Sequence, residues 1–328
     1  MSRFSPKYTL WATTGSDLVS PSFLVCDGLP NSLSDLMTGQ WSGVSTTASG
    51  TWLVTHPPMP LSEAMPPTPT EKTTPPKLQW YSSARSDAGK LRTINEDAYL
   101  ELPELGVWAV ADGMGGHSAG DAASQAVVEA LASLSKTDTI DALIVAAEEK
   151  LQIVNAKLLA MAKRKGPTEI IGTTIVTLLA VYERCAVIWA GDSRLYRYRK
   201  GVLTQMTDDH SLVNDFSRQS ILPNETPSGG NIENIVTRAV GAGPELLLDT
   251  IHFKAQIDDR YLLCCDGLFK EMDHREISEI LSRGQCNDCS QNLIDLALER
   301  GARDNVTVIV VDAVTNHPSM PIEGNEPR

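Results

Sequence analysis

Residues 106–116 read GVWAVADGMGG: an apolar, strand-like run, then Asp112, then a cluster of glycines. The same order recurs at 261–267, where YLLCCDG places Asp266 after an apolar run and Gly267 directly behind it. A strand end fixes the position of a carboxylate, and a following glycine lets a backbone carbonyl or a water approach closely. Taken singly, each Asp-Gly pair is typical of a turn. Their joint occurrence indicates a site built at strand ends.

Three further aspartates flank apolar runs: Asp97, Asp192 and Asp304. Unpaired charge is costly at such positions, and converging carboxylates repel one another unless cations neutralise them. Oxygen-only ligands favour Mg²⁺ or Mn²⁺ over zinc, and two such ions sharing a carboxylate can activate a water for attack on phosphorus. Arg92, four residues before Glu96, is the candidate clamp for anionic oxygens.

The order of the expected elements predicts the fold class. Two long helices, a run of strands and more helices do not form the regular βαβ alternation of a parallel sheet. We therefore expect an α+β protein in which antiparallel sheets pack together with helices outside. The predicted strands are 78–84, 98–102, 106–112, 172–182, 184–190, 194–199, 202–206, 234–238, 247–253, 260–265 and 305–311, and the predicted helices are 119–134, 140–163, 208–219, 275–282 and 290–300.

Proline density divides the chain. Residues 56–77 hold eight prolines, which disfavour helix and sheet and indicate a linker. The predicted organisation is a short head at 1–55, the linker, a body at 78–314 and a flexible tail at 315–328. Within the head, the run at 33–39 predicts a short helix that ends at Gly39.

Net charge and hydropathy limit which cellular compartment and which binding partners are expected for this chain. The formal net charge of -13 argues against nucleic acid and gives little attraction to an anionic membrane. The N-terminus lacks the apolar core of a signal peptide, and the longest apolar stretch, 170–182, is too short to span a bilayer. We expect a cytoplasmic protein without membrane insertion.

The cysteines carry no predicted chemistry. Cys264 and Cys265 lie in an apolar run and are interpreted as small buried hydrophobes. Cys286 and Cys289 form a C-x-x-C pair, but no second pair at suitable spacing completes a four-ligand zinc site.

The body resembles the metal-dependent PPM-type serine/threonine protein phosphatases, especially their bacterial branch. The matching segments occur in the family's order: SDAGKLRTINEDAY (86–99), VADGMGGHSAGDAAS (110–124), GTTIV (172–176), AGDSRLYRY (190–198), MTDDHSLV (206–213), VTRAVG (236–241), LLCCDGLFK (262–270) and DNVTVIVV (304–311). The resemblance implies a central β-sandwich flanked by helices, two Mn²⁺ or Mg²⁺ ions, and a phosphorylated protein as substrate.

The resemblance also implies a role for each site residue. In the family pattern, Arg92 binds the substrate phosphate and Asp112 bridges the two metal ions. The Gly113 carbonyl binds one ion, and Asp266 and Asp304 ligate the other. Glu96 and Asp97 hold metal-bound waters or serve as outer ligands, and Asp192 anchors a third, weaker metal.

Two histidines are given structural roles. Met114 stands where some eukaryotic members carry a histidine proposed as general acid. His117 is not that histidine, and a capping or turn role is expected for it. His210 is likewise interpreted as structural, and 209–237 matches the family's variable flap, which shapes access to the site.

The head has a second resemblance. Residues 10–41 look like the C-terminal part of type VI secretion accessory proteins of the TagF kind, which some bacteria fuse to a PPM-type phosphatase. This implies a phosphatase that opposes a threonine kinase in the control of type VI secretion, with a secretion regulator and that kinase as partners. The alternatives are an unrelated short extension and, for the body, a non-catalytic scaffold of the same fold that binds phosphoproteins.

Overall fold

A computed structural model describes residues 44–46, 52–54, 78–115, 119–166, 168–214 and 235–315. Contacts within the chain separate it into two units, Met1–Lys72 and Thr73–Arg328. In the first unit, β1 (Val44–Thr46) pairs antiparallel with β2 (Trp52–Val54). The predicted helix at 33–39, the linker at 56–77 and residues 316–328 lie outside the described residues.

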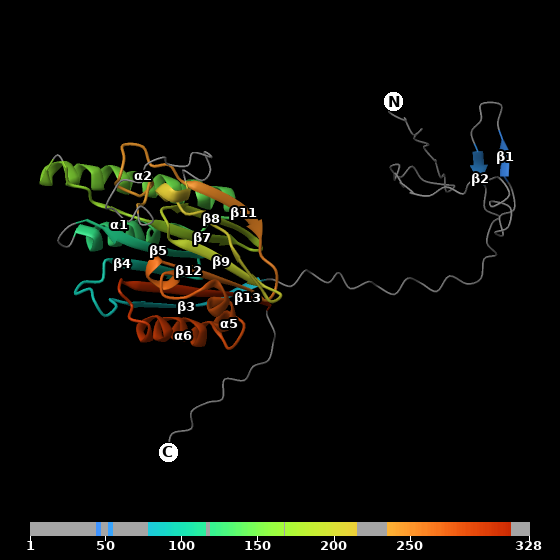
Figure 1. Ribbon diagram of the computed structural model, residues 1–328. Helices are drawn as coiled ribbons and strands as arrows, with labels where there is room; N and C mark the ends of the chain where they lie inside the picture. The colour runs from blue at the N-terminus through green and yellow to red at the C-terminus, as the bar shows by residue number, and fades with distance from the viewer. Residues whose placement is uncertain are drawn as a thin grey trace, which may run out of the picture. The chain divides into compact units, whose positions relative to one another are not determined.

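The second unit contains two antiparallel sheets that pack face to face (Figure 1). One has the order β10-β9-β12-β13-β3, and the other has the order β11-β8-β7-β5-β4 with β6 beside β5. The strands of the first are β3 (Leu78–Asp87), β9 (Arg194–Arg199), β10 (Val202–Gln205), β12 (Asp259–Cys264) and β13 (Val306–Thr315). Those of the second are β4 (Asp97–Leu102), β5 (Val107–Met114), β6 (Gly172–Thr173), β7 (Ile175–Val181), β8 (Arg184–Ala190) and β11 (Asp249–Lys254).

Helices cover the outer face of each sheet, as Figure 1 shows. The β5 sheet is covered by α1 (Ala119–Ala132) and α2 (Ile140–Lys165), and the β12 sheet by α4 (Asp266–Phe269), α5 (His274–Leu281) and α6 (Cys286–Glu299). The layers therefore run helix, sheet, sheet, helix. This arrangement confirms the predicted α+β class with a central antiparallel sandwich.

Trp108 anchors the core between the two sheets. Its side chain on β5 is fully buried, and its ring centroid lies 5.5 Å from that of Trp80 on β3. The indole Nε1 donates a hydrogen bond to Ser82 Oγ at 2.9 Å, so the polar atom of the ring is satisfied. Because β5 and β3 belong to different sheets, this contact helps to hold the two strand layers in register.

Some predicted elements need correction. The strand predicted at 172–182 is divided at Thr174 into β6 and β7, and the strand predicted at 234–238 contributes only an isolated bridge between Val236 and Ser211 in its described part. The helix predicted at 290–300 begins earlier, at Cys286, because Gln285 and Asp288 form a capping box there. Of the helix predicted at 208–219, only 212–214 is described as helical.

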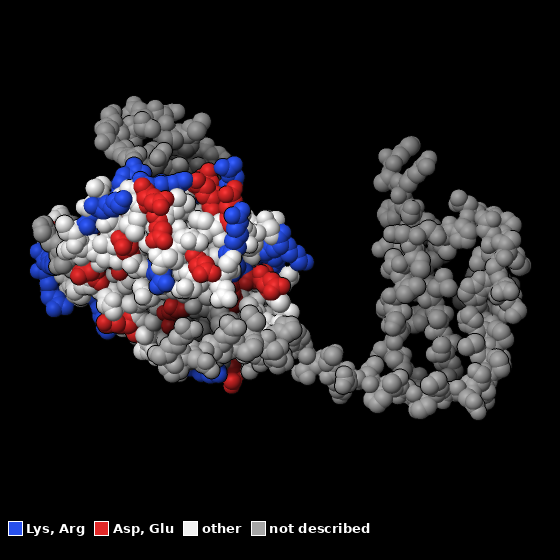
Figure 2. All heavy atoms as spheres, turned by 90° about the horizontal axis from the view of Figure 1, so that it is seen from below, with Lys and Arg blue, Asp and Glu red and all other residues white. Residues whose placement is uncertain are grey.

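Charged side chains of both signs are interspersed on the face that Figure 2 shows. The net negative charge is therefore not gathered into one acidic field on this face, which is the pattern of an ordinary solvated surface. Among the described helices, none combines the length and the apolar character needed to cross a membrane.

Candidate active site

Four strand ends meet at one edge of the sandwich. Asp97 begins β4 and lies directly opposite Asp112 near the end of β5, so the antiparallel register of one sheet places both carboxyls together. Asp266 follows β12, and Asp304 precedes β13, the antiparallel neighbour of β12 in the other sheet. In antiparallel neighbours, the end of one strand adjoins the start of the next. The topology therefore brings acids from distant parts of the chain to one place.

Asp97 joins the two sheets. Thr307 Oγ1, on β13, donates a hydrogen bond to Asp97 Oδ2 at 2.7 Å, while the backbone N–H of Asp97 donates to Asn95 Oδ1. The other carboxylate oxygen, Oδ1, is buried and has no hydrogen-bond partner among the described residues. Burial raises the pKa of Asp97 to about 7, and the charges of Asp266 and Asp304 add to the effect.

Asp112 lies at the centre of the cluster. Burial raises the pKa of its carboxyl well above the ordinary value, and next in effect are the negative charges of Asp97, Asp266, Asp192 and Asp304. These acids therefore act on one another across one shared space. An arrangement that raises carboxyl pKa values in this way is stabilised when a cation occupies the space between them.

Gly113 keeps the backbone of this edge close-packed. A Cβ atom there would lie 2.1 Å from the carbonyl oxygen of Gly120 on α1 and 2.6 Å from that of Glu96. The backbone N–H of Gly113 donates to the same Glu96 oxygen at 3.1 Å. Only glycine fits, and the strand end, the β3–β4 loop and helix α1 are thereby fixed against one another.

Asp266 presents a second unsatisfied oxygen. Its Oδ1 atom is buried without a hydrogen-bond partner in the part of the chain that the structure describes, while Oδ2 forms an ion pair with Lys270. The next residue, Gly267, approaches β13 so closely that a Cβ atom would lie 2.0 Å from Asn305 O. The sequence pattern of aspartate and glycine thus reflects tight packing at both strand ends.

Arg92 and Asp304 close one side of the site. Arg92 Nη2 lies 2.9 Å from Asp304 Oδ2, and the two side chains are 52% and 33% exposed. The hydrogen bond to Asp304 is the main cause that raises the pKa of Arg92, and the charges of Glu96 and Asp112 act in the same direction. The guanidinium therefore faces the cluster and remains open to solvent, as a phosphate clamp requires.

Asn305 was given no role by the sequence analysis, yet it organises the Arg92 loop. Its Nδ2 donates to the carbonyl oxygens of Ala88 and Ile94, at 2.9 and 3.0 Å, and its Oδ1 accepts from the backbone N–H of Glu96. One side chain thus holds three points of the loop between β3 and β4. Its position directly after Asp304 was the only available signal.

Cys265 is a second residue whose surroundings the sequence analysis missed. It is buried, as predicted, but its Sγ accepts a hydrogen bond from Thr307 N at 3.1 Å, and ligand atoms of Asp97, Asp112 and Cys265 lie within 4.8 Å of one another. The thiol is therefore part of the wall of the acidic cluster. The neighbouring Cys264 belongs to the core between the β12 sheet and its helices, as expected.

Asp192 follows β8 and approaches the cluster from another side. Burial raises its pKa to about 6, and Asp266 is the neighbouring charge with the largest effect. Nearby, His210 is fully buried, stacks on Trp189 with ring centroids 5.8 Å apart, and has its Nε2 3.1 Å from Asp249 Oδ2. These contacts give His210 a packing role. His117 and most of the predicted flap, 215–234, lie outside the described residues.

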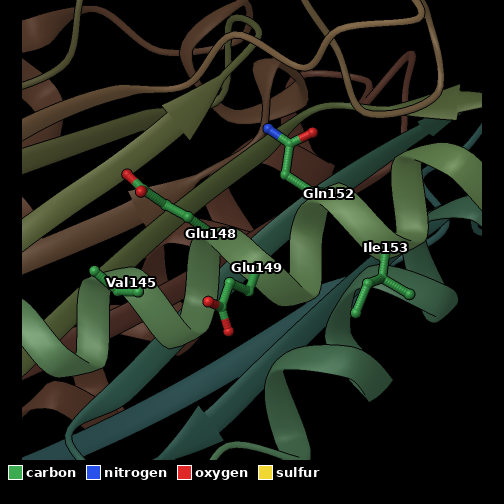
Figure 3. Close-up of a pocket in the computed structure, with 5 residues that line it drawn as sticks. All are labelled: Val145, Glu148, Glu149, Gln152 and Ile153. Carbon is green, nitrogen blue, oxygen red and sulfur yellow. The ribbon is translucent and has the colours of Figure 1, made fainter.

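The residues at this edge fit hard divalent cations. Asp97 and Asp266 each have a buried carboxylate oxygen without a partner among the described residues, and the pKa values of Asp97 and Asp112 are raised. Oxygen ligands in such surroundings favour the binding of a cation. A different hollow, on the outer face of α2, is lined by Val145, Glu148, Glu149, Gln152 and Ile153 (Figure 3). It contains none of the predicted site residues, so the acidic edge is the candidate active site.

The fold and this carboxylate edge fit the class of metal-dependent phosphatases, and similarity to known proteins shows the family. The family model for protein phosphatase 2C matches residues 77–306, and the chain belongs to that family. It is 35% identical over 232 residues to the serine/threonine protein phosphatase PstP of Mycobacterium tuberculosis. This alignment covers 71% of this chain but only 45% of PstP. It is 33% identical over 242 residues to the serine/threonine phosphatase stp of Listeria monocytogenes, covering 71% of this chain and 95% of stp.

Solved structures agree with this assignment. PppA, a key regulatory component of T6SS in Pseudomonas aeruginosa, superposes with a TM-score of 0.67 at 38% identity, covering 72% of this chain and 98% of PppA. The catalytic domain of PstP in complex with 2 manganese ions gives a TM-score of 0.64 at 35% identity, covering 72% and 99% of the two chains.

Proposed function

We propose that this chain is a protein serine/threonine phosphatase that hydrolyses phosphoserine or phosphothreonine with two Mn²⁺ or Mg²⁺ ions. The observation that carries the proposal is the meeting of Asp97, Asp112, Asp266 and Asp304 at one edge, with buried oxygens of Asp97 and Asp266 unsatisfied among the described residues. The complex of the PstP catalytic domain with 2 manganese ions supports the choice of metal.

We assign a role to each side chain of the cluster. Asp112 lies between the acids of both sheets and would bridge the ions, with the Gly113 carbonyl, Asp266 and Asp304 as the other ligands. Bound cations supply Lewis-acid activation of water and neutralise charge on the phosphoryl oxygens. Glu96 and Asp97 would orient water at the inner wall, where the hydrogen bond from Thr307 holds Asp97 in place.

Arg92 would bind the phosphate of the substrate. Its guanidinium is half exposed and contacts Asp304 at 2.9 Å, so it can exchange that carboxylate for phosphoryl oxygens without crossing the protein interior. The hydrogen bonds of Asn305 to the flanking loop keep Arg92 at the rim of the site. The chain thereby places a group that binds anions beside the side chains that would bind the metal ions.

Hydrolysis of a small aryl phosphate by the full chain tests the activity. We expect turnover with Mn²⁺, its loss in chelator, and a fall of about 10³-fold in kcat for Asp112→Asn with Mn²⁺ present. Asp295→Asn, at an exposed position of α6, is the matched control and should keep wild-type turnover. Activity that survives both chelator and Asp112→Asn would reject the proposal, and phosphopeptide binding without turnover would indicate a scaffold instead.

We further propose that the substrate is a regulator of type VI secretion and that the enzyme opposes its threonine kinase. Support comes from PppA, a key regulatory component of T6SS in Pseudomonas aeruginosa, at 38% identity. Phosphoproteomics of a strain that lacks this chain tests the idea. Increased phosphothreonine on secretion components would support it, and unchanged secretion components with increases elsewhere would refute it.

A further inference from the structure

Lys270 places an ammonium group against the acidic cluster. It follows the short helix α4, and its backbone N–H donates to Asp266 O at 3.0 Å, so one helical turn separates the two residues. This spacing puts their side chains on the same face. The Lys270 ammonium forms an ion pair with Asp266 Oδ2, and the two side chains are 36% and 13% exposed. The lysine therefore reaches inward from the rim to a proposed metal ligand.

Asp192 adjoins Asp266, because the antiparallel register pairs Cys264 with Arg194 and the two aspartates lie just beyond this pair. Although burial lowers the pKa of Lys270, the hydrogen bond and charge of Asp266, followed by the charges of Asp192 and Asp304, raise it overall. In return, Lys270 opposes the rise in the pKa of Asp192. Asp97, Asp112 and Cys265 have ligand atoms within 4.8 Å of one another, and this group does not include Asp192 or Asp266. Lys270 thus pairs with the carboxylate that adjoins Asp192.

The Asp192 side of the site is where the family resemblance implies a third, weaker metal ion. The ammonium occupies Asp266 Oδ2 and leaves the buried Oδ1 for one of the two proposed ions, so it competes with a further cation between Asp266 and Asp192. We propose that Lys270 supplies the positive charge at Asp192 and Asp266 that a third cation would otherwise supply, so that this chain binds two divalent ions instead of three. The inference depends on the proposed function, because that function names the two ions.

A tethered charge changes how the site responds to metal supply. A weakly held ion leaves when its concentration falls, whereas Lys270 stays attached to the chain at a fixed effective concentration. The charge at Asp192 and Asp266 is therefore constant over a range of Mn²⁺ concentrations. Occupancy of the two remaining sites alone would set the metal dependence of the enzyme.

Counting bound Mn²⁺ tests the inference directly. Electron paramagnetic resonance of free Mn²⁺ in an equilibrium titration gives the number of ions per chain without using activity. We expect two ions for the wild type and three for Lys270→Met, which removes the ammonium and keeps the length of the side chain. Lys270→Arg should bind two because it retains the charge. Lys254→Met, at an exposed position of β11 in the other sheet, is the control and should also bind two.

A double variant assigns the extra ion to its ligand. Adding Asp192→Asn to Lys270→Met should return the count from three to two, because the extra ion then loses a carboxylate. Thermal melting of each variant establishes that it is folded, and Lys270→Gln, with a polar amide, repeats the test if the Met variant melts early. A third ion in the wild type, or the same count in the wild type and both uncharged variants, would overturn the inference.

The outcomes separate this inference from the proposed function. Two bound ions without any aryl phosphate turnover would overturn the proposed function and leave the Lys270 inference supported by the variant counts. An absence of bound Mn²⁺ in every variant would overturn both.

Discussion

Removing the charge of Asp97 should stabilise the metal-free protein at neutral pH. Asp97 has a pKa of about 7 in the fold against an ordinary value of 3.8, chiefly because it is buried. Between these two values the folded chain retains a proton that the unfolded chain has released. The unfolding free energy therefore falls as the pH rises through this window, and the loss is complete once Asp97 is ionised in the fold. Asp97→Asn cannot ionise and should not show this loss.

The pKa difference gives the size of the effect. At 1.36 kcal/mol for each pH unit, the interval from 3.8 to about 7 corresponds to about 4 kcal/mol of unfolding free energy. Asp112 shares the same space, so part of this value belongs to the pair, and about 4 kcal/mol is the upper limit for the variant. For a domain of this size, each 1 kcal/mol raises the melting temperature by roughly 2 to 4 °C.

Urea denaturation of the wild type and Asp97→Asn, in chelator at several pH values from 4 to 8, measures this difference. The two stabilities should diverge as the pH rises, with the variant more stable at pH 7.5. Saturating Mn²⁺ should reverse the order, because cations stabilise the ionised cluster of the wild type. Asp295→Asn, on the exposed face of α6, is the control and should follow the wild type. Parallel pH profiles of the wild type and Asp97→Asn in chelator would refute the reasoning.

Three further substitutions test other parts of the site and fold. Arg92→Ala should lower kcat/KM for a phosphopeptide by about 100-fold, mainly through KM, and Arg92→Lys should recover part of the loss; an unchanged KM would exclude a phosphate clamp. Gly113→Ala forces a Cβ atom to within 2.1 Å of Gly120 O, so calorimetry should show lost Mn²⁺ binding or a large drop in melting temperature. Wild-type Mn²⁺ binding together with a wild-type melting temperature would contradict the packing argument. Arg260→Met leaves the 15%-exposed Asp312 carboxylate without its cation and removes the donors to Leu281 O and Gly284 O, which should cost about 3 kcal/mol in urea denaturation. Adding Asp312→Leu should restore the part of the loss that comes from the unpaired carboxylate.

The strand-end aspartates could be predicted because their signal is local. An apolar run sets the strand, the acid ends it, and the glycine behind it is required by the close backbone contacts at Gly113 and Gly267. The lack of a regular βαβ alternation likewise sufficed for the α+β class. The break at Thr174 could not be predicted, because Thr173 pairs across to Val240, far along the chain, and no local residue marks it.

Asn305 and Cys265 could not be assigned from the sequence for a different reason. Their significance depends on the atoms that each one meets, and those partners lie in other elements. In the sequence, Asn305 resembles any residue at the start of a strand. Only the structure shows that its side chain donates to two carbonyl oxygens of the loop that contains Arg92. Cys265 reads as a core residue until the register of β12 and β13 turns its sulfur toward the acids.

The proposed metal site would destabilise the fold when its ions are removed. Asp97 and Asp266 each have a buried oxygen without a partner among the described residues, and the pKa of the Asp112 carboxyl is well above its ordinary value. These features disfavour the folded state without metal ions. The core between the sheets, centred on Trp108, must supply enough stability to hold these acids together. A chain that retains such a destabilising cluster at one edge is most simply explained by cations that reverse its cost. If chelator left the unfolding free energy of the wild type unchanged at pH 7.5, that explanation would fail.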